Sequence, residues 1–159
     1  MDQKKYKEPQ ALNDTADFHR TFGLPILEEP TIPSKERCQL RINLLQEELD
    51  ELKQAIEEND LIEVADAFCD IQYVLSGAIH EFGLTDRFRA MFDAVQTSNM
   101  SKVCLTKEIA ERTVKAYADK GEDGHIVPCD DGFLVYRTAD GKVLKSVEYS
   151  PVDLKDHLK

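Results

Sequence analysis

Residues 61–82 read LIEVADAFCDIQYVLSGAIHEF, and this stretch decides the fold of the chain. On a helix its apolar side chains would cover well over half of the circumference, which is typical of a buried element. Gly83 follows directly and is a common residue after the end of a helix. The remaining polar stripe is narrow and falls within an arc of about 80°; it contains Glu63, Asp66, Asp70, Tyr73 and Gly77. The stretch therefore predicts a buried helix with one acidic stripe that faces a cleft.

Apolar periodicity predicts further helices on both sides of this one. They cover about 10–22, 35–58, 86–100 and 107–120. Helix-capping residues stand near the expected ends: Gly23 after the first helix, Ser34 before the second, Asp60 with Glu63 as a capping box for 61–82, and Thr85 before the next.

Two short segments near the C-terminus predict strands. Residues 133–138 and 142–147 flank Asp140-Gly141, which is a strong signal for a hairpin turn. We therefore expect an all-α fold class with one small β-hairpin. The expected single domain spans 1–159, with a four-helix-bundle-type core at about 10–102, an extra helix at about 107–120 and a hairpin at about 133–148.

The composition narrows the classes of partner. Asp and Glu number 31 against 20 Lys and Arg, so the formal net charge is −11. Such a surface repels polyanions, and we expect no nucleic-acid polymer and no membrane as a partner. The four cysteines are scattered without a C-x-x-C pair, and no apolar signal segment follows Met1-Asp2-Gln3-Lys4-Lys5. Both features favour reduced thiols and a cytoplasmic location.

Carboxylates gather in two segments. The first is Glu47-Glu48-Leu49-Asp50-Glu51, in which Glu48 and Glu51 lie along one edge of the apolar stripe of their helix. The second is the acidic stripe of 61–82. A glutamate-rich stretch on an amphipathic helix is usually a solvated face, and Glu63 could act only as a capping partner. The narrow stripe on an apolar helix favours a site, because acidic side chains are rarely buried unless they are paired or bound to metal.

Electrostatics points to a divalent cation. Two carboxylates about 4 Å apart repel by roughly 4 kcal/mol at an effective dielectric constant of 20. No matching row of Lys or Arg stands on the preceding helix to neutralise five of them. Ligands that are all carboxylate oxygens suit Mg²⁺, with Mn²⁺ as a substitute, better than Zn²⁺.

The acidic segments resemble a known signature. Glu47-Glu48-x-x-Glu51 followed by Glu63-x-x-Asp66 is similar to the E-E-x-x-E…E-x-x-D pattern of all-alpha NTP pyrophosphohydrolases, which include MazG-like proteins, dimeric dUTPases and phosphoribosyl-ATP pyrophosphohydrolase. Phe18-His19-x-x-Phe22-Gly23-x-Pro25 resembles the end of the family's N-terminal helix. Two more blocks are similar to one MazG-like branch; they are Ser98-Asn99-Met100-Ser101-Lys102 and the tail hairpin Asp140-Gly141-Lys142-Val143-Leu144-Lys145. The resemblance covers about 14–102 and 133–154. The chain departs from the branch in the inserted residues 103–132, in Ser146 for Gly and in Val147 for Pro.

The resemblance implies roles for these side chains. Metal ligands would be Glu48, Glu51, Glu63, Asp66 and Asp70, and Glu47 would act in catalysis by orienting water or holding a further ion. Asn99, Lys102 and Lys145 would contact the nucleotide, with Tyr73 stacked or hydrogen-bonded near it. Other interpretations stay open. Both lysines could be ordinary surface residues, Asn99 a helix end and Tyr73 a core aromatic. We expect His19 to be a packing or capping residue, and Arg37 and Arg41 to reach phosphate or pair with glutamates one turn on.

The function implied is Mg²⁺-dependent hydrolysis of the α–β phosphoanhydride of a nucleoside triphosphate to a monophosphate and pyrophosphate, by a homodimer or homotetramer. The sequence has no G-x-x-x-x-G-K-[ST] loop, so phosphate must be held by ions and lysines. Two alternatives compete with this hypothesis. One is a phosphoribosyl-ATP pyrophosphohydrolase of histidine biosynthesis, and the other is a non-enzymatic helical interaction module.

Overall fold

The computed structural model describes residues 5–159, so the expectation about a signal segment at the start of the chain falls almost wholly outside the described residues. Two compact units divide the chain, Met1–Phe88 and Arg89–Lys159. Helices dominate, and a single antiparallel pair of strands is the only sheet within residues 5–159. The predicted helical class with a small hairpin is confirmed. None of the described helices combines the length and the apolar character that crossing a bilayer would require.

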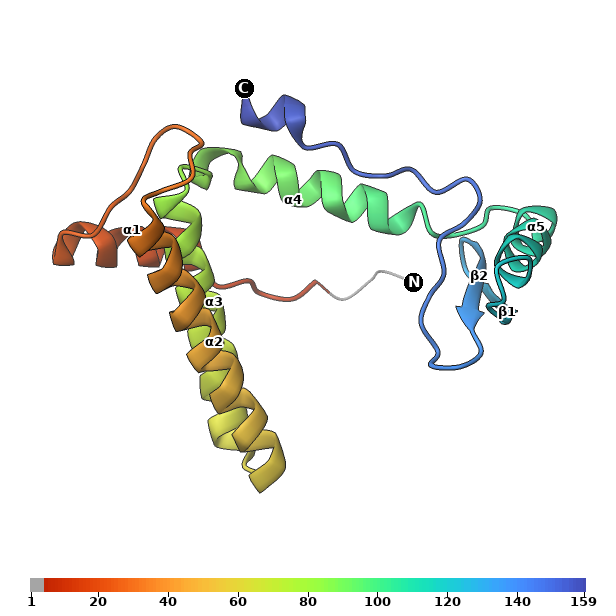
Figure 1. Ribbon diagram of the computed structural model, residues 1–159, viewed down its shortest axis with the longest axis horizontal. Helices are drawn as coiled ribbons and strands as arrows, with labels where there is room; N and C mark the ends of the chain where they lie inside the picture. Colours follow the sequence, from red (N-terminus) through yellow and green to blue (C-terminus); the bar gives the residue numbers. More distant parts are fainter. Residues whose placement is uncertain (1–4) are drawn as a thin grey trace. The chain divides into compact units, whose positions relative to one another are not determined.

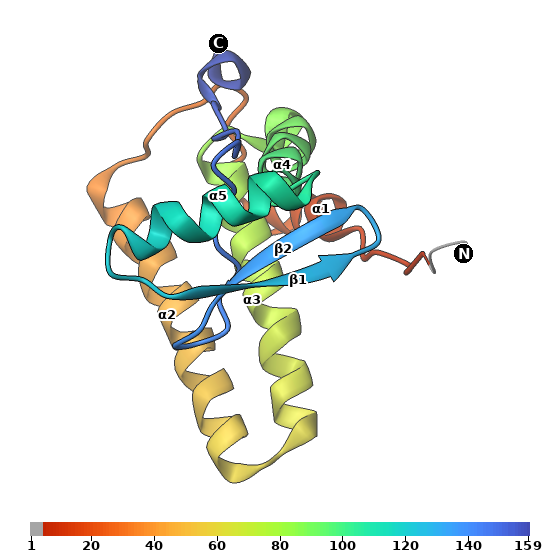
Figure 2. The ribbon, with the colours of Figure 1, turned by 90° about the vertical axis from the view of Figure 1, so that its right-hand side faces the viewer.

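The first unit is built on a long helical hairpin. Helix α2, Lys35–Glu58, and helix α3, Leu61–Glu81, lie side by side and antiparallel (Figures 1 and 2). Helix α1, Ala11–Phe22, packs against α3. These bounds agree with the predicted ones to within one residue. Three of the helices expected in a four-helix core therefore pack together in this unit, and the complete bundle stays a prediction.

Polar residues cap the N-termini of two helices where the sequence predicted, at Ser34 and Asp60. The Ser34 hydroxyl accepts from the Arg37 N–H, and one oxygen of Asp60 accepts from the N–H groups of Ile62 at 2.9 Å and Glu63 at 3.2 Å. The prediction for Thr85 was wrong. Helix α4, Thr85–Met100, begins at this residue instead of after it, and the Thr85 hydroxyl hydrogen-bonds the His80 ring at 2.7 Å.

The α2–α3 hairpin leaves much of its apolar surface uncovered. Small residues form its close contact, with Ala55 and Ala67 each 3% exposed. By contrast, large side chains near the closed end remain open to solvent, with Ile62 79% and Phe68 57% exposed. The prediction that the whole of 61–82 is buried is therefore wrong for the unit by itself. The reason is geometric: a neighbouring helix covers one stripe, whereas the apolar surface of α3 spans more than half of its circumference.

The second unit has its own small core. Helix α5, Lys107–Ala118, lies across the strands β1, Gly124–Cys129, and β2, Gly132–Arg137 (Figure 2). The buried residues of this core share small or aliphatic side chains; they are Cys104, Ala110, Val135 and Leu144. The predicted extra helix is thus present, and it supplies a surface on which the hairpin lies.

The hairpin differs from the predicted one in its partner strand. β2 matches the expected strand 133–138, but it pairs with β1, which precedes it, with Cys129 opposite Gly132. The expected partner 142–147 instead touches the other edge of β2, where the Leu144 N–H donates to the Val135 carbonyl at 2.8 Å. Pro128 weakens the strand signal of β1. It is tolerated because it stands opposite Phe133, whose N–H and carbonyl both bond Cys104 on the far edge.

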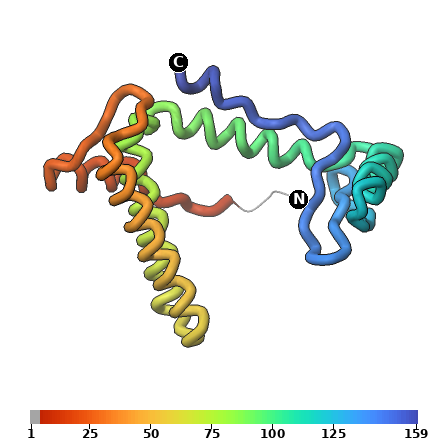
Figure 3. The backbone as a smooth tube through the Cα atoms, viewed as in Figure 1, coloured from red at the N-terminus to blue at the C-terminus, as the bar shows by residue number. Residues whose placement is uncertain are grey.

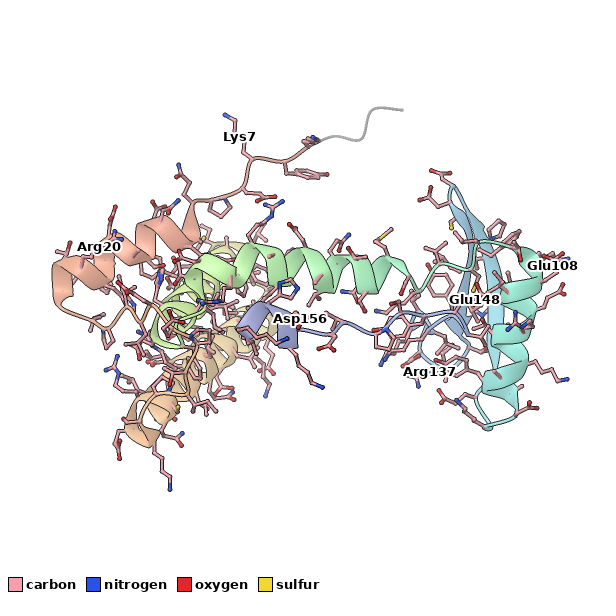
Figure 4. The ribbon with its side chains drawn as sticks, turned by 90° about the horizontal axis from the view of Figure 1, so that it is seen from above. Lys7, Arg20, Glu108, Arg137, Glu148 and Asp156 are labelled. Atoms are coloured by element: carbon pink, nitrogen blue, oxygen red, sulfur yellow. The ribbon has the colours of Figure 1, made fainter. Side chains whose placement is uncertain are left out.

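The C-terminal segment returns along α4. Figure 3 shows the C-terminal end of the tube beside this helix, and Ser98 of α4 bonds the Tyr149 hydroxyl and the Ser150 carbonyl. The chain ends in a short 3₁₀ helix, Lys155–Leu158, which contains the Asp156 labelled in Figure 4. Glu148, also labelled in Figure 4, accepts from Arg112 of α5 at 3.4 Å. All four cysteines of the chain are free thiols.

Candidate metal and substrate site

Glu48 is the central carboxylate of the predicted metal site. It is half-buried on α2, and its Oε2 atom is fully buried without a hydrogen-bond partner among the described residues. Burial raises the pKa of the Glu48 carboxyl above its ordinary value, and four neighbouring carboxylates raise it further, in the order Asp70, Glu51, Glu47 and Asp66. The structure therefore brings together on Glu48 most of the acids that the sequence singled out.

The other predicted carboxylates differ in their exposure. Asp70 is half-buried, whereas Glu47, Glu51 and Asp66 are exposed. Glu63 is also exposed and is not among the groups that raise the pKa of Glu48. Its place in the first turn of α3 puts it nearer the closed end of the hairpin. Between residues 5 and 159, none of these carboxylates forms an ion pair with Lys, Arg or His.

These residues fit a hard divalent cation in their chemistry. Over the described part of the chain, no three His, Cys, Asp or Glu side chains already converge closely enough to hold an ion. The donors are nevertheless all carboxylate oxygens, and Oε2 of Glu48 lacks the positive partner that a buried carboxylate requires. The exposed Glu51 and Asp66 side chains can turn toward Glu48 at little cost in packing. Glu48, Glu51, Asp66 and Asp70 are the residues that would hold Mg²⁺.

A buried charge network joins α2 to α3 at the open end of the hairpin. Arg41 donates to Oε1 of Glu81 at 2.5 Å, and Arg37 donates to Oε2 at 3.0 Å and also to Oε1. Burial by itself would raise the pKa of Glu81, but the hydrogen bonds from Arg37 and Arg41 hold it below its usual value. The hydrogen bond to Glu81 also raises the pKa of Arg37. The two arginines therefore pair with an acid on another helix. The predicted pairing with glutamates one turn on was wrong, and the alternative of a phosphate contact stays a prediction.

His19 completes this network. An arginine only donates, so the Arg41 Nη2, 3.2 Å away, donates to Nε2 of His19. The other ring nitrogen, Nδ1, therefore carries the proton and donates to the Pro25 carbonyl at 2.8 Å. His19 is 2% exposed, as expected for a packing residue. Hydrogen bonds at both ring nitrogens therefore fix the orientation of the His19 ring.

Gly77 makes the close approach of these groups possible. An added Cβ at this position would lie 2.9 Å from both Nη1 of Arg41 and Nε2 of His19. The sequence placed Gly77 on the acidic stripe without a reason for a glycine there, and the structure supplies the reason, which is the lack of room for a side chain.

The sequence analysis missed Glu81, although the sequence contains a signal for it. An acid in the last turn of a helix opposes the helix dipole and calls for a nearby cation.

Tyr73 belongs to an aromatic cluster. Its ring meets Phe18 of α1 edge to face, with the ring centroids 5.7 Å apart, and it remains 39% exposed. The ring centroids of Phe18 and Phe22 are 4.3 Å apart. Tyr73 is thus a partly exposed aromatic on the edge of the α1–α3 contact.

The predicted substrate residues of the second unit have partners within that unit. Nζ of Lys102 donates to the side-chain oxygen of Asn99 at 2.9 Å, at the C-terminal end of α4. Nζ of Lys145 lies 4.6 Å from the centroid of the Tyr149 ring. The sequence had singled out neither Tyr149 nor its contact with a lysine.

Comparison with known proteins identifies the family of the helical part. Residues 15–99 match the sequence model of the family described as phosphoribosyl-ATP pyrophosphohydrolase, which is more than half of the chain. The chain belongs to this family. The family lies in the all-alpha NTP pyrophosphohydrolase superfamily, so the resemblance given by the acidic signature is confirmed.

The phosphoribosyl-ATP pyrophosphohydrolase family match contains every acidic residue of the candidate site. It runs from α1 into α4 and reaches Asn99, whereas Lys102 and Lys145 lie beyond it. Membership supports a pyrophosphohydrolase, that is, a hydrolase acting on phosphoanhydride bonds. An uncharacterised protein of Acanthamoeba polyphaga mimivirus is 32% identical over 94 residues, which cover 54% of this chain and 36% of that protein. The chain thus spans little more than a third of the length of this relative.

Proposed function

We propose that the protein is a Mg²⁺-dependent nucleoside triphosphate pyrophosphohydrolase. Water would add across the α–β phosphoanhydride and give a nucleoside monophosphate and pyrophosphate. The observation that carries this proposal is the buried, unpartnered Oε2 of Glu48, surrounded by Glu47, Glu51, Asp66 and Asp70, inside the region that matches the family. A cytoplasmic location and the absence of nucleic-acid and membrane partners stay predictions from the composition.

The roles of the carboxylates follow from their burial. Glu48 and Asp70 are the least exposed, so they are the fixed members of the ligand set, and Glu51 and Asp66 would complete it from the solvent side. Glu63, nearer the closed end of the helical hairpin, stays a predicted ligand. A bound Mg²⁺ polarises phosphoryl oxygens and lowers the pKa of coordinated water. Glu47 is exposed next to Glu48, and its carboxylate would accept a proton from the attacking water.

The two lysines that the resemblance singled out would neutralise phosphate charge. A triphosphate carries about four negative charges, and the chain itself has a formal charge of −11, so the phosphates need cationic partners. Lys102 and Lys145 would contact them, with Asn99 beside Lys102 as a hydrogen-bonding group. Tyr73, with its exposed edge, would lie near the base or sugar.

A second candidate substrate is phosphoribosyl-ATP, and the description of the matching family favours it. It carries the same α–β phosphoanhydride, so the carboxylates would act on it in the same way. Phosphoribosyl-ATP differs from an ordinary nucleoside triphosphate by its additional phosphoribosyl group. One panel of substrates therefore separates them.

We further propose that the protein works as a homodimer or homotetramer. Leu49 and Ile56 on α2 and Ile62 and Phe68 on α3 are each more than half exposed, although they are large and apolar. Large apolar side chains exposed in this number on one helix pair favour an interface. A second copy of the same hairpin presents the same side chains, so the surface is complementary to itself, as two-fold assembly requires.

The test is a product analysis of the full chain. We would incubate it with Mg²⁺ and a panel of ribonucleoside and deoxyribonucleoside triphosphates together with phosphoribosyl-ATP, and separate the products by anion-exchange chromatography. Monophosphate and pyrophosphate in equal amounts are expected, and Glu48→Gln should abolish their formation. Release of single phosphate, or no turnover on the whole panel with Mg²⁺ or Mn²⁺, would contradict the proposal. Exclusive cleavage of phosphoribosyl-ATP would select the second candidate.

A further inference from the structure

The end of α4 and the C-terminal segment meet through a small set of hydroxyl groups in the second unit. Ser98 is 6% exposed, and its Oγ lies 2.8 Å from the Tyr149 hydroxyl and 2.9 Å from the Ser150 carbonyl. A carbonyl only accepts, so the single proton of Ser98 is donated to Ser150. The Tyr149 hydroxyl must therefore donate to Ser98. In this hydrogen bond the Tyr149 hydroxyl is thus the donor and Ser98 of α4 the acceptor.

A second serine strengthens the same junction. The Ser150 N–H donates to Oγ of Ser101 at 2.9 Å, while this hydroxyl donates to the Ser98 carbonyl at 2.7 Å. The motif Ser98-Asn99-Met100-Ser101-Lys102 thus divides into two parts. Its serines hold Tyr149 and Ser150, and its Asn99 and Lys102 bond each other at 2.9 Å.

The ammonium group of Lys145 lies over the face of the Tyr149 ring. The ammonium group lies 4.6 Å from the ring centroid, within the roughly 6 Å over which a cation is attracted to an aromatic face. The intervening turn is fixed independently, because the Tyr149 N–H donates to the Ser146 carbonyl at 2.9 Å and the Val147 N–H donates to Thr113 of α5 at 3.1 Å. Lys145 itself is exposed, so the ring supplies its side-chain contact on an otherwise open surface.

We infer that Tyr149 is a positioning residue for phosphate binding. It ties Lys145 to the α4 end that carries Lys102, so that the two ammonium groups act on the same polyphosphate. This inference rests on the proposed function, since it takes phosphate to be what the lysines bind. The residue acts through Lys145 and does not itself touch the ligand.

The structure offers a matched control. Lys120 also lies over a tyrosine, with Nζ 5.4 Å from the Tyr117 centroid, and it is exposed two residues beyond the end of α5. The Tyr117 hydroxyl accepts from the Lys145 backbone N–H at 3.2 Å, whereas the Tyr149 hydroxyl bonds Ser98 of the α4 motif. Lys120→Ala removes the same charge from the same kind of contact. It should therefore leave phosphate binding unchanged if the position beside α4 is what counts.

The test uses pyrophosphate with Mg²⁺ as the probe and the full chain in titration calorimetry. Lys145→Ala should weaken binding on the order of tenfold or more, because a charge-assisted contact is lost. Tyr149→Leu should weaken it about two- to fivefold, which is the range of an exposed cation–π contact. Tyr149→Phe keeps the ring and should fall between wild type and Tyr149→Leu.

The decisive variant combines the two changes. In the Lys145→Ala background, Tyr149→Leu should have no further effect, because a residue that acts only through Lys145 has nothing left to position. Additive losses would mean a separate role for Tyr149 and would overturn the inference. Equal affinity of Tyr149→Leu and wild type would do the same, as would an absence of pyrophosphate binding by the wild type.

Folding and function are read out separately. Thermal unfolding of each variant shows whether it is folded, and if Tyr149→Leu fails to fold, Tyr149→Phe and Ser98→Ala still test the link from the ring to α4. If the protein cleaves nucleoside triphosphates and Tyr149 variants bind pyrophosphate as wild type does, the proposed function holds and this inference is wrong. If the protein binds pyrophosphate through Lys145 and Tyr149 but cleaves no substrate of the panel, this inference holds and the proposed reaction is wrong.

Discussion

Arg41 of α2 donates to Glu81 of α3 at 2.5 Å, across 40 residues of sequence, and both side chains are more than nine-tenths buried. This ion pair fastens the open end of the helical hairpin. Glu48 lies seven residues further along α2, about two turns toward the closed end, where its closest charged neighbours are carboxylates. The helical hairpin therefore carries an ion-paired cluster of opposite charges at one level and a cluster of like charges at the next.

Glu81→Gln should strongly destabilise the first unit. The substitution leaves the buried Arg41 without its counter-charge, and breaking a buried pair in this way costs about 3–5 kcal/mol. Urea unfolding followed by circular dichroism measures the loss. Glu57→Gln, at an exposed position of α2, is the matched control and should change stability by less than about 0.5 kcal/mol. Equal stability of the two variants would mean that the network contributes nothing.

Gly77→Ala should destabilise although alanine favours helices. The added methyl group would lie 2.9 Å from Arg41 and from His19, and overpacking of this kind costs about 1–3 kcal/mol. The gain in helix propensity, about 1 kcal/mol, offsets only part of this cost. Ala65→Gly, at an exposed position of α3, reports the propensity effect by itself. A Gly77→Ala protein that is more stable than wild type in chemical denaturation would contradict the close contact.

Glu48→Gln should stabilise the protein in the absence of divalent ions. The substitution removes one charge from a cluster of like charges, and relief of a single exposed repulsion is worth about 1 kcal/mol. In wild type, Mg²⁺ at a hundredfold excess over its dissociation constant should stabilise the fold by about 2.7 kcal/mol. This increment should vanish in Glu48→Gln and persist in Glu57→Gln. Thermal unfolding with EDTA and with Mg²⁺ compares all three proteins, and an unchanged Mg²⁺ response in Glu48→Gln would exclude it as a ligand.

Acid should weaken the fold through His80. This ring is fully buried, with Nε2 donating to the Leu12 carbonyl at 2.9 Å, and burial holds its pKa below the ordinary 6.5. A lowered pKa means that the folded state disfavours the proton. Its stabilising effect is therefore complete above about pH 6.5 and is lost as the pH falls through the lowered pKa of the folded state.

The measurement is the free energy of unfolding between pH 8 and pH 5. One proton gives a slope of at most about 1.4 kcal/mol per pH unit. Glu81, whose pKa is lowered, adds a separate loss at more acidic pH, below about 4.5. His125 is exposed, so His125→Gln should keep the decline near neutrality, whereas His80→Gln should flatten it. A flat wild-type profile from pH 8 to pH 5 would contradict the argument.

Light scattering should give a mass of at least twice 18.1 kDa at micromolar concentration. The reason is the apolar surface on α2 and α3, of which Phe68 is 57% exposed. Phe68→Asp places a charge in the proposed interface and should shift the protein toward the monomer. Leu105→Asp, at an apolar residue of the second unit that is 72% exposed, is the control for the change in charge. A monomeric wild type would remove the proposal of assembly.

Local sequence determined the helices and the acidic signature. The ends at Ser34 and Asp60 and the periodicity of 61–82 depend on neighbours within a few residues, so they can be predicted without a fold. The same holds for Glu47, Glu48, Glu51, Glu63 and Asp66, whose spacing was enough to place the chain in its superfamily. The strand 133–138 was also predictable, because its composition is typical of a strand.

Only the tertiary structure decided which distant groups meet. Glu81 takes both arginines, Gly77 makes room for them and for His19, and β1 takes the place beside β2 that the turn signal at Asp140-Gly141 assigned to 142–147. Such choices depend on the closeness of residues tens of positions apart, which local periodicity does not encode. Tertiary packing also decides which of the predicted carboxylates are buried and which are exposed. Their spacing marked all of them as candidates, and the packing of α2 on α3 buried one oxygen of Glu48 and left Glu63 exposed.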